Sequence, residues 1–397
     1  MKNLALLTTS LAMMFAGYCS KSSAQGDNKF LHQEIISVPR GEQAPRANPG
    51  QNNFGGMILP AGATQANRPR PNAQAAQRPP MQMARPAMQV GPRDMDITEI
   101  SMSDPFIYAD AETQTYYLTG TGGSLYKSKD LKTWNGPYNI IDLSGTWMQG
   151  NFVAAGEIHK YGDKYYYAGT WNNHGVCIEQ VPRRYNVPLN QTQLLVSDKV
   201  DGPYLPLVKD STFCLGPVDW DIIDGTLYEE NDTVYMVFVH EWTQLIDGTM
   251  DYFPLSKDLT HRTAEPTTMF RASEAAWSKE MNSIGEATFG LRMPGWVTDG
   301  PQMFRTQTGV LGMLWSSWGD TRYAQGIAYS TSGSIKGPWV QEETAFLANN
   351  SGHGMLFRKF DGTLLYIVHH DAGNGRKPQI WTVDDSGDKL KLGERIL

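Results

Sequence analysis

Short apolar segments separated by turn residues run along the chain from about residue 95 to its end. Tyr, Val, Phe and Trp are frequent within these segments, and Gly, Asp and Asn lie between them. No long stretch places apolar residues at the 3.6-residue period of an amphipathic helix. The pattern therefore predicts an all-β fold that is built from many short strands.

One combination of a polar turn and an aromatic or aliphatic strand recurs along this part of the chain. The copies are 114–118, 162–166, 231–235, 308–312 and 361–365. Repeat units of about 50 to 75 residues with several strands each are typical of propeller blades. We therefore predict a five-bladed β-propeller over residues 95–397. A large β-sandwich, or a pair of sandwiches, is the alternative.

Residues 25–94 have a different composition and no hydrophobic period. They contain 10 of the 23 Pro residues, many Gln, Asn and Ala, and neither Trp nor Tyr. Such a segment cannot bury enough apolar surface to offset the entropy lost on ordering. We expect a disordered Pro/Gln-rich linker here, acting as a solvated spacer or as a basic tether.

Residues 1–24 have the features of a secretory signal peptide. Lys2 precedes an apolar stretch over 4–17, and small residues precede Gln25. The stretch is shorter than the ~20 residues that cross a bilayer. The alternative is a lipoprotein anchored through Cys19. Both interpretations predict an exported protein, periplasmic or extracellular, and no other segment predicts a membrane span.

Net charge and cysteine content exclude two classes of partner or scaffold. The formal net charge is −7, and such an acidic chain would be repelled by a nucleic-acid backbone. Three cysteines are too few for a disulfide scaffold or a thiolate zinc cluster. We therefore expect no nucleic-acid partner, and the composition leaves the oligomeric state open.

Each predicted blade has an ionisable residue in its first strand, upstream of the repeated turn. These residues are Asp104, Glu157, Asp224, Asp299 and His353. The first strand of a blade lies nearest the propeller axis, so we expect the five side chains to converge in one pocket. For each acid taken alone, a carboxylate in a turn is the ordinary alternative, most clearly for Asp299, which precedes a glycine.

Carboxylates that face one another across a pocket can act as general acid and general base. Burial and mutual repulsion raise the pKa of one of them, so that it stays protonated while another is ionised. Glycoside hydrolysis needs this division of roles. We expect Trp171, Trp242 and Trp296, which lie close in sequence to these strands, to stack on sugar rings, with Glu157 and His353 also contacting the substrate.

Four short motifs occur in order along the predicted propeller: Asp104-Pro105-Phe106, Ile223-Asp224-Gly225, Asp299-Gly300-Pro301 and Gly352-His353. From about residue 97 to 397 the chain thereby resembles the family-43 glycoside hydrolases, five-bladed propellers that cleave pentosides with inversion. The resemblance implies that Asp104 is the general base and that Asp224 orients the acid and tunes its pKa. It places Asp299 at the general acid, and His353 beside an axial calcium ion or water-filled site.

Two departures from the family pattern affect the predicted site. The usual Trp-Ala-Pro-Glu of the second blade is Ala154-Ala155-Gly156-Glu157, which reshapes the sugar pocket. The acid position has Asp299, one methylene shorter than the usual Glu, so another carboxyl is a reserve acid: Glu241, or more weakly Glu286. Loss of hydrolysis, with sugar binding retained, is the remaining explanation.

The predicted function is hydrolysis of α-L-arabinofuranosides or β-xylosides of plant polysaccharides in a single inverting displacement. This mechanism expects about 6.5–9.5 Å between the acid and base carboxyls. It requires no cofactor, although the resemblance admits an axial calcium ion at His353. The alternatives are a propeller glycosidase for galactosides or algal anhydro-sugars, and a non-catalytic carbohydrate-binding propeller. Because adjacent residues on a strand point to opposite faces, we interpret His369 and His370 as ordinary structural residues.

Overall fold

The computed structural model describes residues 91–397 except for 180–185, 211–212, 282–294, 321 and 374. The predicted signal peptide, nearly all of the predicted linker and Glu286 lie outside the described residues. Among the residues that the structure does describe, no helix is long and apolar enough to cross a membrane.

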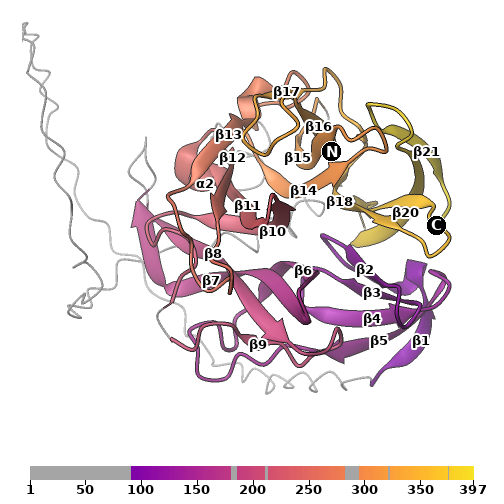
Figure 1. Cartoon of the computed structure of the whole chain (residues 1–397), viewed down its shortest axis with the longest axis horizontal. Coiled ribbons are helices and arrows are strands. Elements are labelled where there is room, and N and C mark those ends of the chain that lie inside the picture. The colour runs from indigo at the N-terminus through magenta and orange to yellow at the C-terminus, as the bar shows by residue number, and fades with distance from the viewer. Residues whose placement is uncertain (1–90, 180–185, 211–212, 282–294, 321, 374) are drawn as a thin grey trace, which may run out of the picture. The chain divides into compact units, whose positions relative to one another are not determined.

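Five antiparallel sheets surround a common centre, and we count the strands of each blade outward from that centre (Figure 1). Residues 93–96, although first in the chain, form the outermost strand of blade 1. The prediction of an all-β, five-bladed propeller is confirmed. Blade 1 has the order β1-β5-β4-β3-β2, with β1 (Arg93–Asp96), β2 (Phe106–Asp110), β3 (Thr115–Thr119), β4 (Ser124–Ser128) and β5 (Thr133–Asn139). Blade 2 contains β6 (Val153–Tyr161), β7 (Lys164–Glu179), β8 (Asn186–Ser197) and β9 (Leu205–Pro206).

The remaining blades follow in chain order. Blade 3 contains β10 (Ile222–Glu230), β11 (Thr233–His240), β12 (Thr249–Pro254) and β13 (Thr267–Arg271). Blade 4 contains β14 (Asp299–Arg305), β15 (Leu311–Trp318), β16 (Tyr323–Ser330) and β17 (Trp339–Gln341). Blade 5 contains β18 (Ser351–Arg358), β19 (Leu364–Asp371), β20 (Arg376–Asp384) and β21 (Lys391–Arg395). Helical turns are η1 (Ile97–Glu99), α2 (Trp242–Leu245) and η2 (Ala272–Glu274).

The recurring turn of the sequence joins the first and second strands of every blade. Its copies lead into β3, β7, β11, β15 and β19. The turn residues at Gly162, Asn231, Gly309 and Gly362 have positive φ angles, a conformation that Gly and Asn adopt with little steric cost. The repeat in the sequence is therefore the first hairpin of each blade.

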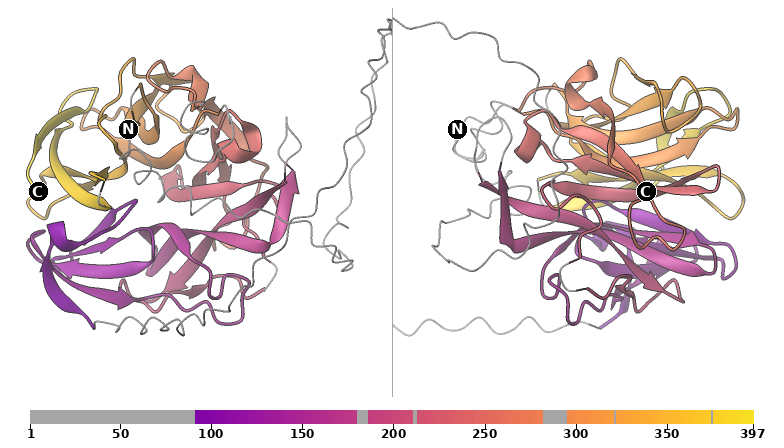
Figure 2. Two further views of the ribbon diagram at one scale, coloured as in Figure 1. Left: turned by 180° about the vertical axis from the view of Figure 1, so that it is seen from behind. Right: turned by 60° about the vertical axis from the view of Figure 1, so that its left-hand side comes forward.

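The core consists of apolar layers between adjacent blades. A typical layer lies between blades 3 and 4, where Val237 and Val239 pack with Met313 and Trp315. The layer between blades 5 and 1 closes the ring, with Ile367 packed in the same cluster as strands β2 and β3. Figure 2 shows this seam and its neighbours from two further directions. Since every blade is made of consecutive strands, packing and a few hydrogen bonds must hold the two ends of the propeller together.

The strand β1 pairs with β5, with Asp94 opposite Asn135. The described propeller therefore begins a few residues before the boundary at residue 95 that the composition predicts. The reason is that the alternation in Arg93–Asp96 is too short to stand out against the Pro-rich sequence before it.

Candidate active site

The first strands of blades 2 to 5 have a register shift near the propeller centre, and in blade 1 the residue Asp104, just before β2, has an unusual backbone conformation. The register shifts lie between Ala154 and Glu157, Ile223 and Thr226, Asp299 and Gln302, and Gly352 and Met355. Bulges of this kind redirect side chains and occur next to active sites. One residue per blade has a positive φ angle there: Asp104 (56°), Ala155 (47°), Asp224 (53°), Gly300 (51°) and His353 (47°).

These five residues, which we call the bulge residues, are the equivalent positions of the blades. They correct the expectation that the five ionisable residues predicted from the sequence occupy equivalent positions of the five blades. Asp104, Asp224 and His353 are bulge residues, whereas Glu157 comes two positions after Ala155 and Asp299 comes one position before Gly300. The sequence repeat locates blades well, but it does not show where the extra residue of each bulge falls.

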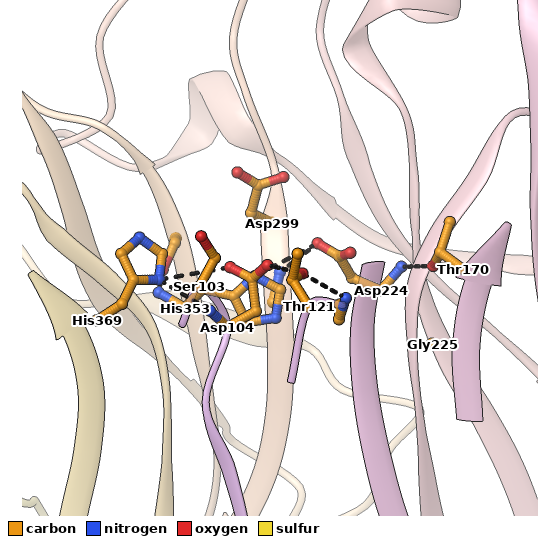
Figure 3. A network of polar contacts seen from close by, with 12 residues as sticks. Ser103, Asp104, Thr121, Thr170, Asp224, Gly225, Asp299, His353 and His369 are labelled. Carbon is orange, nitrogen blue, oxygen red and sulfur yellow. Dashed lines mark hydrogen bonds and ion pairs between the residues drawn. The ribbon is translucent and has the colours of Figure 1, made fainter. Parts of the chain in front are cut away.

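Three of the bulge residues meet near the centre of the propeller (Figure 3). The Nδ1 atom of His353 lies 3.2 Å from Oδ1 of Asp104 and 3.6 Å from Oδ2 of Asp224. Their side chains are 11%, 10% and 8% exposed, respectively. An imidazole therefore bridges two carboxylates that are largely removed from water.

The backbone N–H groups of the bulge residues bond to side chains from the preceding blade. The pairs are Ala155 with Thr121 Oγ1 at 2.9 Å, Asp224 with Thr170 Oγ1 at 2.9 Å, His353 with Ser316 Oγ at 2.8 Å, and Asp104 with His369 Nδ1 at 3.1 Å. The acceptors come from the second strand or, for Thr121, from just beyond it. These bonds tie neighbouring blades together at the level of the site.

Blade 4 departs from this pattern. The N–H of Gly300 donates to Oδ2 of Asp224, at 3.1 Å. The strand position in blade 3 that corresponds to Thr170 is Val239, which lies opposite Ile223. Because an aliphatic side chain cannot accept a hydrogen bond, the carboxylate of Asp224 takes the N–H instead. This contact fixes the orientation of Asp224.

Gly300 also makes room for the central imidazole. A Cβ atom at this position would lie 2.5 Å from Cδ2 of His353. From the sequence, Gly300 is explained as a turn residue after Asp299. In the structure, the close approach of His353 and the positive φ angle require a glycine at this position.

Asp299 is partly exposed, and its Oδ2 accepts a hydrogen bond from the Tyr323 hydroxyl at 2.8 Å. In Figure 3 its carboxyl lies apart from the Asp104, His353 and Asp224 group, on one side of it. The reserve acid Glu241 is only 1% exposed. Of the two carboxyls, Asp299 is the one with access to a bound molecule.

The carboxyls of the site are held in different protonation states. Burial opposes ionisation of Asp104, but the attraction of His353 outweighs it and holds the pKa of Asp104 well below its ordinary value. Burial and the repulsion of Asp224 raise the pKa of Asp299 to about 8. Burial raises the pKa of Asp224 to about 6, against the attraction of His353. Near neutral pH one carboxyl can therefore accept a proton and another can give one.

The predicted axial calcium ion is not matched by a suitable donor set. Although burial opposes it, the surrounding carboxylates of Asp104, Asp224 and Asp299 raise the pKa of His353, which favours an imidazolium cation. Calcium takes six to eight oxygen ligands. Within the described part of the chain, no three His, Cys, Asp or Glu side chains form a group that could hold a metal. We derive no step through a metal.

Blade 2 contributes a second carboxylate–imidazole pair. Oε2 of Glu157 lies 2.8 Å from Nε2 of His159, and Glu157 is 7% exposed. The small residues before Glu157 have a packing reason, since a Cβ atom at Gly156 would lie 1.7 Å from the Tyr167 hydroxyl. The Tyr167 side chain occupies the space that the departure from the family pattern leaves.

Two of the three predicted sugar-stacking tryptophans lie in apolar clusters. Trp171 is 0% exposed between blades 1 and 2, and Trp242 is 6% exposed beside Met281 and Val297. Neither indole face is available to a sugar in this structure, which corrects that expectation. Trp296 is partly exposed.

Four residues of the site were missed by sequence reasoning. Thr121 donates a hydrogen bond to Oδ2 of Asp104, and Nδ1 of His369 lies 3.4 Å from its Oδ1. Tyr323 contacts Asp299, as described above. Arg376 donates to Ser103 Oγ at 3.1 Å. His369 corrects the interpretation of the His pair as ordinary. The available signal is its place on the second strand of a blade, where it lies opposite the residue before the bulge residue, as do Thr170 and Ser316.

Comparisons with known proteins agree with this architecture. Residues 96–385 match the model of the glycosyl hydrolases family 43. The structure of an endo-arabinase from Bacteroides thetaiotaomicron VPI-5482 is 34% identical, with a TM-score of 0.63, over 72% of this chain and 95% of that chain. No curated protein matches.

Two more distant structures share the fold. An endo-1,4-β-xylanase from Bacteroides thetaiotaomicron VPI-5482 is 20% identical, with a TM-score of 0.55, over 75% of this chain and 98% of that chain. An α-L-arabinofuranosidase from Lactobacillus brevis is 16% identical, with a TM-score of 0.53, over 74% of this chain and 93% of that chain. At these identities the similarity concerns the fold alone.

Proposed function

Because the chain belongs to glycosyl hydrolases family 43, we propose that it cleaves α-L-arabinofuranosyl linkages of a plant polysaccharide in a single inverting displacement. The observation that carries the proposal is the contrast between two carboxyls of one site: His353 and Thr121 contact Asp104, whereas Asp299 contacts the Tyr323 hydroxyl and is repelled by Asp224. The choice of arabinofuranosyl over xylosyl linkages is supported by the 34% identical structure, which is named an endo-arabinase.

In the proposed reaction, the ionised Asp104 takes a proton from a water molecule whose oxygen attacks the anomeric carbon. Asp299 gives its proton to the glycosidic oxygen as the bond from that oxygen to the anomeric carbon breaks. The attacking water enters opposite the leaving group, so the anomeric configuration inverts. Room for that water corresponds to about 6.5–9.5 Å between the two carboxyls.

The other polar residues orient these two groups. Thr121 and His353 contact the carboxylate of Asp104 and stabilise its charged form, and Nδ1 of His369 accepts the backbone N–H of the same residue. Asp224 repels the ionised form of Asp299 and so keeps the proton on the acid. We propose that Glu157 and Trp296 contribute sugar contacts at the edge of the site. No cofactor takes part in the proposed reaction.

Hydrolysis of linear arabinan, xylan and the aryl α-L-arabinofuranoside and β-xyloside tests the function. We expect arabinan and arabinofuranoside to be cleaved, and Asp104→Asn and Asp299→Asn to lower kcat at least about a hundredfold, as for loss of an acid or base. Asp198→Asn is the matched control, because Asp198 is 84% exposed and forms an ion pair with Lys164 on the outside of blade 2. Proton NMR of the first-formed anomer shows whether the anomeric configuration is inverted or retained.

Each other outcome has a defined meaning. A retained anomeric configuration would overturn the inverting displacement. Activity that survives Asp299→Asn would overturn the assignment of the acid. Cleavage of xylan alone would move the substrate class to β-xylosides. Binding of arabinan without turnover by the wild type would indicate a carbohydrate-binding propeller.

We also propose that the protein acts outside the cytoplasm, on the basis of the signal-like residues 1–24. Mass spectrometry of the mature N-terminus tests this. A chain beginning at Gln25 supports cleavage, a lipid on Cys19 supports an anchored form, and an intact Met1 in an exporting host contradicts both.

A further inference from the structure

One aromatic pair contacts both the acid and the base of the proposed site. Tyr323, at the start of β16, donates its hydroxyl hydrogen bond to Asp299. Its ring stacks on that of His369, with centroids 5.6 Å apart and an interplanar angle of 9°. His369 in turn accepts the N–H of Asp104 at 3.1 Å. The two carboxyls, 195 positions apart in the sequence, are thus linked through two stacked side chains.

The Tyr323 ring has little freedom to move. It is 6% exposed, and Trp318 meets it edge-on at 6.0 Å and lies opposite it in the β15–β16 pairing. A Cβ atom at Gly352 would lie 2.3 Å from Cε1 of Tyr323, so the strand β18 has a glycine where the ring passes. The hydroxyl is therefore a fixed donor.

A fixed donor at this place matters because the proposed acid is short. The hydroxyl lies 2.8 Å from Oδ2 of Asp299, which is already hydrogen-bonding distance. A side chain longer by one methylene would bring its carboxyl into that hydroxyl. The position of Tyr323 therefore suits Asp and disfavours Glu.

We propose that Tyr323 is a positioning residue that holds the short acid Asp299 and, through its stack on His369, sets the acid relative to the base Asp104. The inference rests on the proposed function, because it assigns the roles of acid and base to these carboxyls. The contact itself does not depend on that function, and one arm of the test below measures it without substrate.

The hydroxyl also affects the charge of Asp299. The groups that act on this carboxyl are Asp224 on β10, His353 on β18, Asp104 before β2, Tyr323 on β16 and the buried Glu241 before α2. Donation by Tyr323 stabilises the ionised form and so lowers the pKa of Asp299, against the larger effects of burial and Asp224. Its removal is therefore expected to raise that pKa further.

The first test compares Tyr323→Phe with Tyr329→Phe. Tyr329 lies on the same strand, and its hydroxyl accepts the N–H of Leu390 at 2.9 Å, away from the site. We expect Tyr323→Phe to lower kcat about ten- to a hundredfold with KM nearly unchanged, since acid catalysis acts in the transition state. The loss should be smaller with a dinitrophenyl leaving group, which needs no proton. A Tyr323→Phe enzyme that matches Tyr329→Phe would overturn the proposal.

The second test exchanges the acid. Asp299→Glu alone is expected to lose activity, because Tyr323 blocks the longer side chain. The double variant Asp299→Glu with Tyr323→Phe is expected to be at least about ten times more active than Asp299→Glu alone. Full activity of Asp299→Glu with Tyr323 present would overturn the proposal. So would a double variant that is no more active than Asp299→Glu alone.

The third test separates this inference from the proposed function. The carboxyl carbon of Asp299 is titrated by carbon-13 NMR in the free protein, in the wild type and both Tyr→Phe variants. A higher pKa in Tyr323→Phe alone supports the contact even if no glycoside is cleaved. An unchanged pKa overturns the contact even in an enzyme that hydrolyses arabinan.

Discussion

At the scale of single residues, the site depends on how the surroundings of three aspartates give their carboxyls three different pKa values. Asp104 faces two imidazoles and is held ionised. Asp224 shares one of these imidazoles and accepts the N–H of Gly300. Asp299 accepts a hydrogen bond from the Tyr323 hydroxyl. Burial and the repulsion of Asp224 outweigh the attraction of His353 and raise the pKa of Asp299 to about 8. Environment, rather than residue type, assigns the roles.

This difference predicts the alkaline limb of the pH–rate profile. The pKa of Asp299 is about 8, so kcat/KM is expected to fall as pH rises through about 8, where the acid loses its proton. Asp224→Asn removes a repelling carboxylate, lowers the pKa of Asp299 and moves this limb to lower pH. The measurement is kcat/KM from pH 4 to 10 for both proteins. A limb that stays in place or moves upward in Asp224→Asn would contradict the assignment.

At the scale of strands, hydrogen bonds connect the bulges of the first strands to acceptor side chains of the second strands in the preceding blades. Four of the five bulge N–H groups bond to a side chain that lies on the second strand of the preceding blade or just beyond it. Only Val239 breaks the series, and the N–H of Gly300 turns to Asp224. An apolar residue on β11 thus orients a polar residue on β10.

We therefore predict that Val239→Thr lowers activity by supplying a competing acceptor. A threonine hydroxyl at this place is expected to take the N–H of Gly300 and release Asp224, with a loss of about tenfold in kcat, or about 1.4 kcal/mol of transition-state stabilisation. Val237→Thr is the matched control on the same strand, since both valines are 0% exposed in one cluster. Both changes put a hydroxyl into the core and cost about 1–3 kcal/mol of folding stability.

Kinetics and urea unfolding of both variants make the comparison. Equal stability losses with reduced kcat only in Val239→Thr support the role of Val239. Equal activities would show that the orientation of Asp224 does not depend on this position.

At the scale of the whole molecule, the site exists only while the ring is closed. Asp104 belongs to the first blade, and His353 and His369 belong to the last (Figure 1). The seam between these blades consists of apolar packing together with contacts such as Met102 N–H to the Arg376 carbonyl at 3.0 Å. Within the described residues, each sheet contains only strands of its own blade, so no strand pairing joins the first blade to the last.

We predict that Ile367→Ala, at this seam, lowers kcat at temperatures where the protein is still folded. Ile327→Ala, in the layer between blades 4 and 5, is the control, and both isoleucines are at most 2% exposed. Each cavity is expected to cost about 2–5 kcal/mol of unfolding free energy. Only the first loosens the contact of Asp104 with His369, so a larger loss of kcat in Ile327→Ala would contradict the role of the seam.

The sequence by itself determined the class of fold and three carboxylates of the site. Strand periodicity and turn chemistry are local properties, so five hairpins were visible in the spacing of their turns. Asp104, Asp224 and Asp299 are predicted because each lies a similar distance upstream of a repeated turn and within one of the short motifs that occur in order along the chain.

Only the tertiary structure decided which residues complete the site. Thr121, Tyr323 and His369 reach it from the far ends of second and third strands, and their distance in sequence from their partners hides the contact. The burial of Trp171 depends on a neighbouring blade, which local sequence does not describe. The protonation of each carboxyl likewise follows from burial and opposing charges in space. These contacts and charge interactions join segments that are distant in sequence and come together only when the blades close into a ring. A sequence pattern describes neighbours along the chain and therefore does not reveal them.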